Sequence, residues 1–587
     1  MTHPSLGGDG AGPARAVACI GAGPAGLLAA TQIKAARPGW RVEVFERQPR
    51  GVTFGYGVVF SDIAVRTIEY LAPTLGELLV KQTRWEDVEV RSHGGRHRIP
   101  GHGYVALSRH RLLGELVRRA EDVGVVVHHE TPVALDELRD AYDLVIAADG
   151  ARSRTRRALA RELGASVTEG RSRFAWLGTG ARFDAMTFIF EQTSTGVVVA
   201  HGYPHGDGIS TFVVEVPEGT GAAEEVDLPH WEHVLAKHLD GHPLEARDSA
   251  WSRFPQVRLE RCVHDNVVVI GDAAHTAHYS VGSGTRLALE DGFYLARMLT
   301  RYPDLSHALA EYQRRRLPSA RELQTAGARS MRWFERAPLY LKRPAAQFSA
   351  HLLTRAAHVV AEDLKADVPA LAGAAAAELA EAAGSAVSES AFDVPLNTGT
   401  LHLPGRRVTE TGAAATDEGP SLVLSPSPSR PEAGSPPHLT VRLPGEDHPR
   451  LALYETGPCP ETAEQAAEGT RRILEQSPHP ATVPATGIRV RVGPGAQSRP
   501  RQAAAALQAQ ARALYEVGRC DLVDLAAEPG REPAPGESTA VLEIAGAVRA
   551  ATGIPVMLSG FRAEPGQIET HLLAGRIDLW CEPEGEV

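Results

Sequence analysis

Near its N-terminus the chain carries a glycine-rich turn, Gly21-Ala-Gly-Pro-Ala-Gly26, directly after the apolar stretch Ala16-Val-Ala-Cys-Ile20. In this spacing Gly21 permits a tight turn, Gly23 lets the backbone approach a pyrophosphate, and Gly26 allows a helix to pack closely on a strand. The free amides at the start of that helix favour an anion. The turn predicts a dinucleotide site, with a glycine turn that binds no ligand as the alternative.

An acidic residue completes this unit. The sequence predicts a helix over residues 27–36 and a second strand over residues 41–45, so Glu46 stands at the end of a βαβ unit. A carboxylate there accepts hydrogen bonds from ribose hydroxyls and repels a 2′-phosphate, which predicts FAD or NAD rather than NADP. Arg47 follows it and belongs to the same predicted site.

Two further motifs narrow the cofactor to FAD. Asp149-Gly150, with Ser153 and Arg156, follows a buried strand predicted over residues 142–148, and Gly271-Asp272 follows another over residues 267–270. The Asp272 carboxylate can reach a ribityl hydroxyl of a flavin. The three motifs stand in this order about 120 residues apart, an arrangement that points to FAD held for reaction with oxygen.

Length and composition indicate a soluble protein of two or three domains. A chain of 587 residues is too long for one core, and 43% hydrophobic residues is ordinary for a globular protein. The formal net charge of −11 argues against general nucleic-acid binding. The five cysteines show no metal-ligand spacing and fit a reducing cytoplasm, and we expect neither a signal peptide nor a membrane span.

The predicted architecture is a Rossmann-type α/β domain over residues 16–390, after a disordered N-terminus at 1–15. Alternating apolar and polar residues predict an inserted antiparallel β-sheet at about 171–260, which would cover the substrate. An arginine-rich helical end is predicted at about 305–365. We expect the three parts to form one FAD-binding unit.

Residues 391–587 return to the strand–helix alternation typical of a parallel sheet, interrupted by a low-complexity segment at 411–437 that cannot build a core.

The motifs GxGxxG at Gly21, DGxxSxxR at Asp149 and GDAAH at Gly271 together resemble those of the single-component (group A) FAD-dependent aromatic hydroxylases. Residues 16–370 are similar to the salicyloyl-CoA and anthraniloyl-CoA monooxygenase branch of that family. Most aromatic hydroxylases have proline where this chain has His278, whereas the aryl-CoA branch shares the histidine. The segments that carry this similarity are Phe54–Asp62, Trp176–Thr179, Leu239–Pro243 and Gly271–Thr285.

The resemblance implies the aromatic hydroxylase fold and an FAD-dependent oxygenase. NAD(P)H, bound transiently as a co-substrate, would reduce FAD. Oxygen would add at C4a, and the resulting (hydro)peroxide would oxygenate an aromatic or related ring carried as an acyl-CoA thioester.

The resemblance also implies roles for individual residues. His278, Tyr279 and Ser280 would line the cavity beside the flavin, whereas His201 and Tyr203 would either orient the substrate or be ordinary sheet residues. Arg109 would face the FAD pyrophosphate or be a solvated charge at a helix end. The predicted cofactor-binding residues are Gly21, Gly23, Gly26, Glu46, Arg47, Arg109, Asp149, Gly150, Gly271, Asp272, Gly282, Gly284 and Thr285; no metal site is predicted.

A CoA ester carries several phosphate charges, for which basic side chains would be needed. Arg314–Arg316, Arg329, Arg332 and Arg336 are available, although their helical spacing also fits a solvated face.

Residues 391–587 resemble a truncated Old Yellow Enzyme-type FMN domain, a TIM-barrel remnant, in the segments 392–401, 422–426, 553–557 and 573–579. A complete (β/α)₈ barrel takes about 250 residues, so we expect an incomplete one. Three carboxylates after the last predicted strand would repel a phosphate, and we do not expect FMN there.

Three other functions stay open at this point. The first is dioxygenation with cleavage of the CoA thioester on a tropone-type acyl-CoA in secondary metabolism. The second is a flavin reductase or dehydrogenase of the same fold. The third concerns residues 391–587 alone, as a non-catalytic interaction or homodimerisation module.

Overall fold

The fold is that of a computed structural model, which describes residues 14–382 apart from 54, 207, 248, 249, 357 and 358. Beyond residue 391 it describes the helices and strands given below with short adjoining stretches. Residues 1–13 and most of 411–437, both interpreted above from composition, lie outside the described residues.

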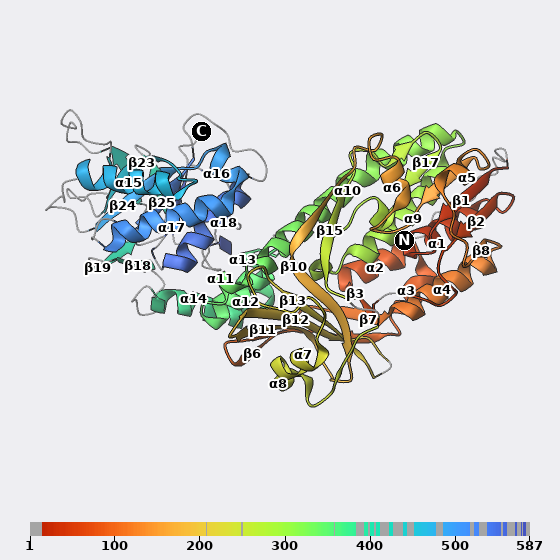
Figure 1. The fold of residues 1–587 in the computed structure, drawn as a ribbon, viewed down its shortest axis with the longest axis horizontal. Helices are drawn as coiled ribbons and strands as arrows, with labels where there is room; N and C mark the ends of the chain where they lie inside the picture. The colour runs from red at the N-terminus through yellow and green to blue at the C-terminus, as the bar shows by residue number, and fades with distance from the viewer. Residues whose placement is uncertain are drawn as a thin grey trace. The chain divides into compact units, whose positions relative to one another are not determined.

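The chain divides into two compact units, Met1–Pro338 with Arg355–Ala357, and Leu339–Thr354 with His358–Val587 (Figure 1). The boundary predicted at residue 390 falls inside the second unit.

A six-stranded sheet forms the centre of the first unit, with the order β16-β17-β9-β1-β2-β8. Every neighbouring pair is parallel except β16 and β17. Its central strands are apolar throughout, as expected where both faces of a parallel sheet are covered. The strands are β1 (Ala16–Ile20), β2 (Arg41–Phe45), β8 (Val126–His128), β9 (Leu144–Ala147), β16 (Val263–His264) and β17 (Val267–Val269).

Helices α1 (Pro24–Ala36) and α9 (Gly284–Arg301) pack tightly together on this sheet. Gly292 permits the approach, because a methyl group there would lie 2.7 Å from the Ala25 carbonyl oxygen. Helix α4 (Arg109–Asp122) also contacts α1. The remaining short helices are α2 (Asp62–Leu71), α3 (Pro73–Leu79), α5 (Leu135–Arg139), α6 (Arg154–Ala158), η1 (Gly271–Ala273) and η2 (Tyr279–Val281).

The second sheet has the order β14-β10-β13-β12-β11-β5-β6, with β15 beside β10. Its neighbours are antiparallel except β11 and β5. The sheet expected at about 171–260 is therefore present and also takes in two earlier strands. The strands are β5 (Val88–Ser92), β6 (Gly95–Ile99), β10 (Ser166–Thr179), β11 (Met186–Thr193), β12 (Gly196–Pro204), β13 (Ser210–Val216), β14 (Leu244–Glu245) and β15 (Ser252–Arg258).

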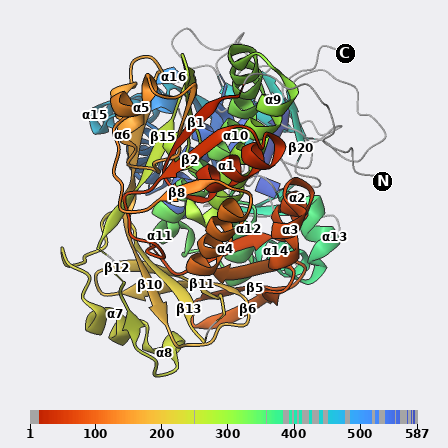
Figure 2. The ribbon, with the colours of Figure 1, turned by 90° about the vertical axis from the view of Figure 1, so that its right-hand side faces the viewer.

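One face of this sheet packs on α7 (Leu228–Val234) and α8 (Ala236–Leu239), which Figure 2 shows on one side of it. Because side chains alternate along a strand, neighbouring positions point to the opposite face. That opposite face carries Phe174, Trp176, Phe188, His201 and Glu215, and it contributes to the candidate site described below.

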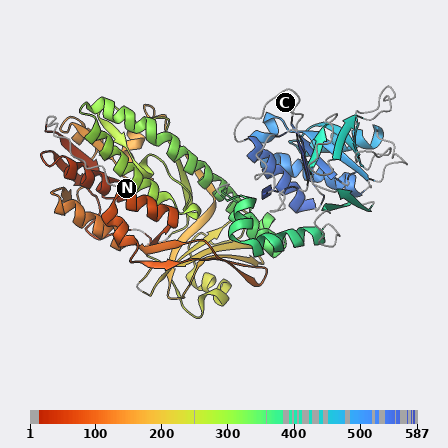
Figure 3. The same cartoon turned by 180° about the vertical axis from the view of Figure 1, so that it is seen from behind.

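A small sheet, β3 (Gly57–Ser61), β7 (Tyr104–Ser108) and β4 (Thr83–Trp85), completes the strands of the first unit. The predicted helical end begins with α10 (Leu305–Glu335), a long helix that runs beside β10 (Figures 1 and 3). Short helices follow: α11 (Ala337–Tyr340), α12 (Ala345–Leu353), α13 (Ala361–Asp367) and α14 (Pro369–Ala382). Among the described helices, none is long and apolar enough to cross a bilayer.

The second unit contains a closed barrel formed by β20 to β27 in chain order. Strands β23 to β27 are parallel neighbours, whereas β21-β22 and β22-β23 are antiparallel. The expectation of an incomplete barrel is therefore wrong, because the eight strands close. Antiparallel neighbours need shorter connections than parallel ones, which lets the barrel close within the residues present.

The barrel strands are β20 (Arg407–Glu410), β21 (Leu422–Pro426), β22 (His438–Arg442), β23 (Leu451–Pro458), β24 (Ala485–Arg491), β25 (Leu522–Ala526), β26 (Val556–Ser559) and β27 (Leu579–Glu582). The other elements of this unit are β18 (Phe392–Leu396), β19 (Gly399–Leu403), α15 (Ala463–Gln476), α16 (Pro494–Ser498), α17 (Pro500–Glu516) and α18 (Glu537–Thr552).

Candidate active site

The three glycines of the turn between β1 and α1 differ in their surroundings. Gly21 has a φ of 104°, and a methyl group there would lie 2.5 Å from the Ala148 carbonyl oxygen. A methyl group at Gly26 would overlap the Gly21 carbonyl oxygen, so the helix packs directly on the turn. At Gly23 no described atom lies within 4 Å of that position. The turn is therefore closed on the protein side and open where a pyrophosphate would approach.

Glu46 is bonded to the same turn. Its Oε2 accepts a hydrogen bond of 2.8 Å from the Ala22 amide, and its Oε1 accepts one of 2.9 Å from the Gln48 amide. A carboxylate has further lone pairs, so these bonds orient Glu46 and leave it able to accept from a ribose hydroxyl. Its neighbour Arg47 is exposed.

The second and third motifs are joined by Arg156. Asp149 follows β9 and caps α6 by accepting from the Arg154 amide at 2.8 Å. The buried Arg156 guanidinium donates to the Ala151 carbonyl at 2.6 Å and to the Ala273 carbonyl at 2.9 Å. Two segments distant in sequence thus meet at the carboxyl ends of neighbouring parallel strands, the usual place for ligands in such sheets.

A buried network of charged side chains is bonded to the third motif. Asp291 on α9 accepts from the Gly271 amide at 2.8 Å and lies 2.8 Å from His275 Nε2 and 2.9 Å from Arg316 Nε. Although burial acts the other way, His275 and Arg316 lower the pKa of Asp291 to about 2. Asp272, beside this network, is exposed.

Two buried polar atoms test whether these residues fit FAD. Among the described residues, Arg109 Nε and Asp149 Oδ1 are buried without a hydrogen-bond partner. Arg109 begins α4, which Ser108 caps by accepting from the Arg111 amide at 3.2 Å. An unpartnered guanidinium at a helix N-terminus suits a pyrophosphate, and the open position at Gly23 suits its approach. The residues present therefore fit FAD, which supplies the redox chemistry when bound.

Next to the third motif, aromatic side chains from the second sheet, η2 and α10 form what we call the aromatic box. Its centre is Tyr279, whose ring lies 5.0 Å from Phe174 and 5.7 Å from Trp176 between centroids. The box consists of Phe174, Trp176, Phe188, Phe254, Tyr279 and Phe334. These rings pack against one another, and the aromatic surface that they form suits contact with the face of a flat apolar ligand.

A carboxylate lies within this apolar surrounding. Glu215 on β13 is fully buried; its Oε2 accepts 2.7 Å from the Tyr279 hydroxyl and lies 3.5 Å from His201 Nε2. Burial alone would raise the pKa of Glu215, but His201, His278 and Tyr279 together lower it. Among the described atoms, Glu215 Oε1 and His201 Nε2 are buried without a hydrogen-bond partner. Unsatisfied buried polar atoms are costly, so this pair is suited to a polar group of a ligand.

His278 lies beside the box on the loop that precedes η2. Its ring is 4.1 Å from Tyr279 and 4.9 Å from Phe254 between centroids. Its Nδ1 lies 2.7 Å from Ser280 Oγ. Burial lowers the pKa of His278 to about 3, so the imidazole is neutral near pH 7.

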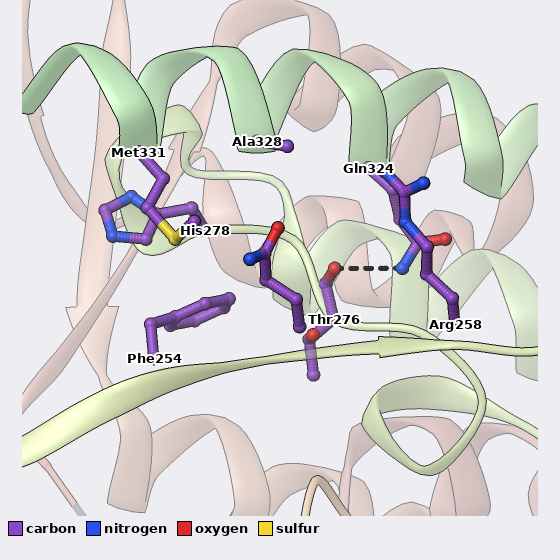
Figure 4. Close-up of a pocket in the computed structure, with 8 residues that line it drawn as sticks. Phe254, Arg258, Thr276, His278, Gln324, Ala328 and Met331 are labelled. Atoms are coloured by element: carbon purple, nitrogen blue, oxygen red, sulfur yellow. Dashed lines mark hydrogen bonds between the residues drawn. The ribbon is translucent and has the colours of Figure 1, made fainter. Parts of the chain in front are cut away.

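A cavity of about 10 Å³ adjoins His278 between α10 and β15 (Figure 4). This volume is at the lower limit of what one water molecule needs, roughly 10–15 Å³, and far too small for an aromatic ring. Its lining residues are Phe254, Gln256, Arg258, Thr276, His278, Gln324, Ala328 and Met331.

The remaining predicted residues lie at different places around the site. The Tyr203 hydroxyl donates to the Gly57 carbonyl at 3.1 Å, and its ring stacks on Trp85. Tyr203 therefore contacts the small sheet, through β3 and β4. Gly282 has a φ of 60°, and Gly284 and Thr285 begin α9.

Three arginines considered for CoA phosphates are engaged within the protein. Arg314 and Arg315 bond Glu311, and Arg316 is buried against Glu290 and Asp291.

Sequence reasoning missed Glu215, Ser330 and Arg355. The signal for Glu215 was available, since a lone charge within the apolar run Ser210–Val216 is unusual in a buried strand. Arg355 gave no such signal, because it follows α12 far from every motif. It donates 2.7 Å to the Ser280 carbonyl and 2.8 Å to Ser330 Oγ.

Comparison with known proteins identifies the family. A family model described as an FAD binding domain matches residues 109–326. Salicyloyl-CoA 5-hydroxylase from Streptomyces sp is 39% identical over 358 residues, which cover 58% of this chain and 69% of that protein. The 3-hydroxy-4-methyl-anthranilyl-[aryl-carrier protein] 5-monooxygenase of Streptosporangium sibiricum is 38% identical over 319 residues, 54% of this chain and 88% of the relative.

Among solved structures, the tetrameric form of 2-methyl-3-hydroxypyridine-5-carboxylic acid oxygenase matches at 20% identity and a TM-score of 0.49, covering 59% of this chain and 96% of that one. The chain therefore belongs to the FAD-dependent aromatic monooxygenase family and is an oxidoreductase with FAD as its cofactor.

Proposed function

We propose that the first unit hydroxylates an aromatic ring presented as an acyl-CoA thioester, with FAD, O₂ and NAD(P)H. The observation that carries this proposal is the aromatic box, with the Glu215–His201 pair inside it and His278 beside it. The substrate ring binds against the aromatic surface of the box, and the polar pair accepts from or orients one polar substituent on it.

The names of the relatives support a substrate ring that is attached to a carrier. The name of one specifies a salicyloyl-CoA substrate, and the name of the other specifies an anthranilyl group on an aryl-carrier protein. The roles proposed for this chain rest on its own residues. Tyr279, at the centre of the box, contacts the ring, Glu215 and His201 hold the substituent, and the apolar side chains around them exclude water from the reacting groups.

The decisive experiment is product analysis under ¹⁸O₂ with the FAD-loaded enzyme and NAD(P)H. The panel pairs aryl-CoA thioesters that carry a ring hydroxyl or amino group with matched thioesters that lack it and with the free acids. We expect one ¹⁸O atom on the ring of an intact thioester.

Two other outcomes would contradict the proposal. Two labelled atoms together with a cleaved thioester would indicate dioxygenation. Oxidation of NAD(P)H with no label in any product would indicate a flavin reductase.

For residues 391–587 we propose a non-catalytic remnant of an Old Yellow Enzyme-like barrel that serves folding or homodimerisation. The parallel run β23–β27 with its intervening helices supports the ancestry. The buried Arg489 pairs with Asp524, which also accepts 2.6 Å from Ser559, so this layer of the barrel is filled by its own side chains.

Two measurements test this assignment. Flavin released by acid should contain FAD without FMN. A chain truncated after residue 390 that stays monodisperse, soluble and fully active would contradict a role in folding or dimerisation.

A further inference from the structure

A chain of hydrogen bonds leads from a buried guanidinium to His278. Arg355 Nε donates to Ser330 Oγ at 2.8 Å, and Ser330 Oγ lies 2.6 Å from Ser280 Oγ. Ser280 Oγ lies 2.7 Å from His278 Nδ1. Arg355 follows α12 in sequence, yet it belongs to the first compact unit, where its guanidinium lies over the rings of Phe188 and Phe334 at 5.3 and 5.2 Å.

The chemistry of the first donor determines the direction of this chain. A guanidinium has donors and no acceptor, so the Ser330 oxygen must accept from it. The Ser330 proton then has one described acceptor within reach, Ser280 Oγ, and the Ser280 proton in turn has His278 Nδ1. Each hydroxyl donates once and accepts once, and every group in the chain is satisfied.

The opposite direction leaves one group unsatisfied. If His278 Nδ1 carried the proton and donated to Ser280, the hydroxyl of Ser280 would donate to Ser330. The Ser330 proton would then have no described acceptor, although that residue is fully buried. An unsatisfied buried donor disfavours this arrangement by roughly five- to a hundredfold.

A second contact agrees with the first direction. The Ser280 amide points at His278 Nδ1 at 3.4 Å, which requires a lone pair on that nitrogen. Burial keeps the ring neutral, so one of its two nitrogens carries a proton and the other has a lone pair.

We propose that Arg355 is a positioning residue that sets the tautomer of His278, through Ser330 and Ser280, with Nδ1 as acceptor and the proton on Nε2. His278 then offers a neutral N–H donor beside the aromatic box and does not act as a base through that nitrogen. Arginine serves this purpose because its donors have fixed geometry and because burial lowers the pKa of Arg355 only to about 10, so the guanidinium stays charged near pH 7. The effect on hydroxylation rests on the proposed function, whereas the tautomer does not.

The direct test is ¹⁵N NMR of the FAD-loaded enzyme labelled at histidine, with His278→Gln used to identify the signals of His278. Ring ¹⁵N shifts separate a protonated nitrogen from one with a lone pair. We expect a bare Nδ1 and a protonated Nε2 in the wild type. A protonated Nδ1 would overturn the proposal without any further variant.

Two variants test the role of the chain. Ser330→Ala removes one hydroxyl, and Arg355→Met removes the donor while keeping much of the apolar stem. Both should reduce the preference for one tautomer at least fivefold. Arg315→Met is the matched control, since that exposed arginine of α10 pairs with Glu311, and it should leave the signals unchanged. An unchanged preference in both test variants would refute the role of Arg355.

A functional measurement separates the tautomer from its consequence. In the two test variants, the fraction of oxidised NAD(P)H recovered as oxygenated product should fall about three- to tenfold, with hydrogen peroxide making up the difference. A changed tautomer with unchanged coupling would overturn the catalytic consequence. If the wild type hydroxylates no aryl-CoA, the proposed function fails while the NMR result still decides the tautomer.

Discussion

Gly327 on α10 offers a sharp test of how the His278 loop is held in place. A methyl group at this position would lie 2.9 Å from the His278 amide nitrogen and 3.5 Å from Ala277 Cα. Real contacts of this kind are rarely shorter than 3.4 Å, so Gly327→Ala must move the loop by about half an ångström or more. The atoms it meets are backbone, which cannot rotate away.

The magnitude follows from two opposing effects. Replacing a helical glycine by alanine stabilises a helix by about 1 kcal/mol. Overpacking against a fixed backbone costs about 1–3 kcal/mol. Gly327→Ala should therefore change the free energy of unfolding by between zero and about 2 kcal/mol in the destabilising direction. Because a small misplacement of a reacting group can cost up to about a hundredfold in rate, the activity should fall by one to two orders of magnitude.

The matched control is Gly114→Ala on α4, where no described atom lies within 4 Å of the added methyl group. It should be stabilised by about 1 kcal/mol and keep full activity. Thermal melting of the FAD-loaded proteins and product formed per NAD(P)H oxidised provide the two measurements. If Gly327→Ala matches Gly114→Ala in both, then α10 does not position His278 as described.

Three further predictions concern charged groups. Glu215→Gln should leave FAD bound but weaken the binding of a hydroxylated thioester about tenfold, because a hydrogen bond to a charged acceptor is stronger than one to a neutral acceptor by about 1–1.5 kcal/mol. Titration of the flavin absorbance measures this affinity, and equal affinity in both proteins would contradict the prediction. Arg109→Met should weaken FAD binding about ten- to a hundredfold, measured by equilibrium dialysis, whereas the exposed Arg111→Met on the same helix should not. The lowered pKa of Asp291 contributes about 2 kcal/mol of stability that is present above pH 4 and lost as the pH falls towards 2, so Asp291→Asn should flatten that part of the stability curve in urea titrations. Against the effect of burial, Asp291 raises the pKa of His275, so the same urea titrations should show the contribution of this pair in full between about pH 4 and pH 6.5, with loss as the pH rises through the folded-state pKa of His275.

Local signals were sufficient for the cofactor side of the site. The glycine turn at Gly21–Gly26 requires backbone conformations and close contacts that few other residues tolerate, so its spacing is readable without a structure. The strands on either side of it are short apolar runs, and β1 and β2 have the predicted bounds. The barrel was harder, because the direction of strands β21–β23 depends on pairing partners that local sequence does not encode.

By itself the sequence determined the FAD motifs, their order and the family resemblance that the relatives confirm. Each of these depends on residues adjacent in the chain, where backbone sterics and hydrogen bonding act locally. Only the tertiary structure decided that Glu215 accepts from the Tyr279 hydroxyl and that Arg355 donates to the Ser280 carbonyl in the loop of His278. These contacts join residues 64 and 75 positions apart, and they exist because the packing of two sheets and α10 buries polar groups that must then find partners.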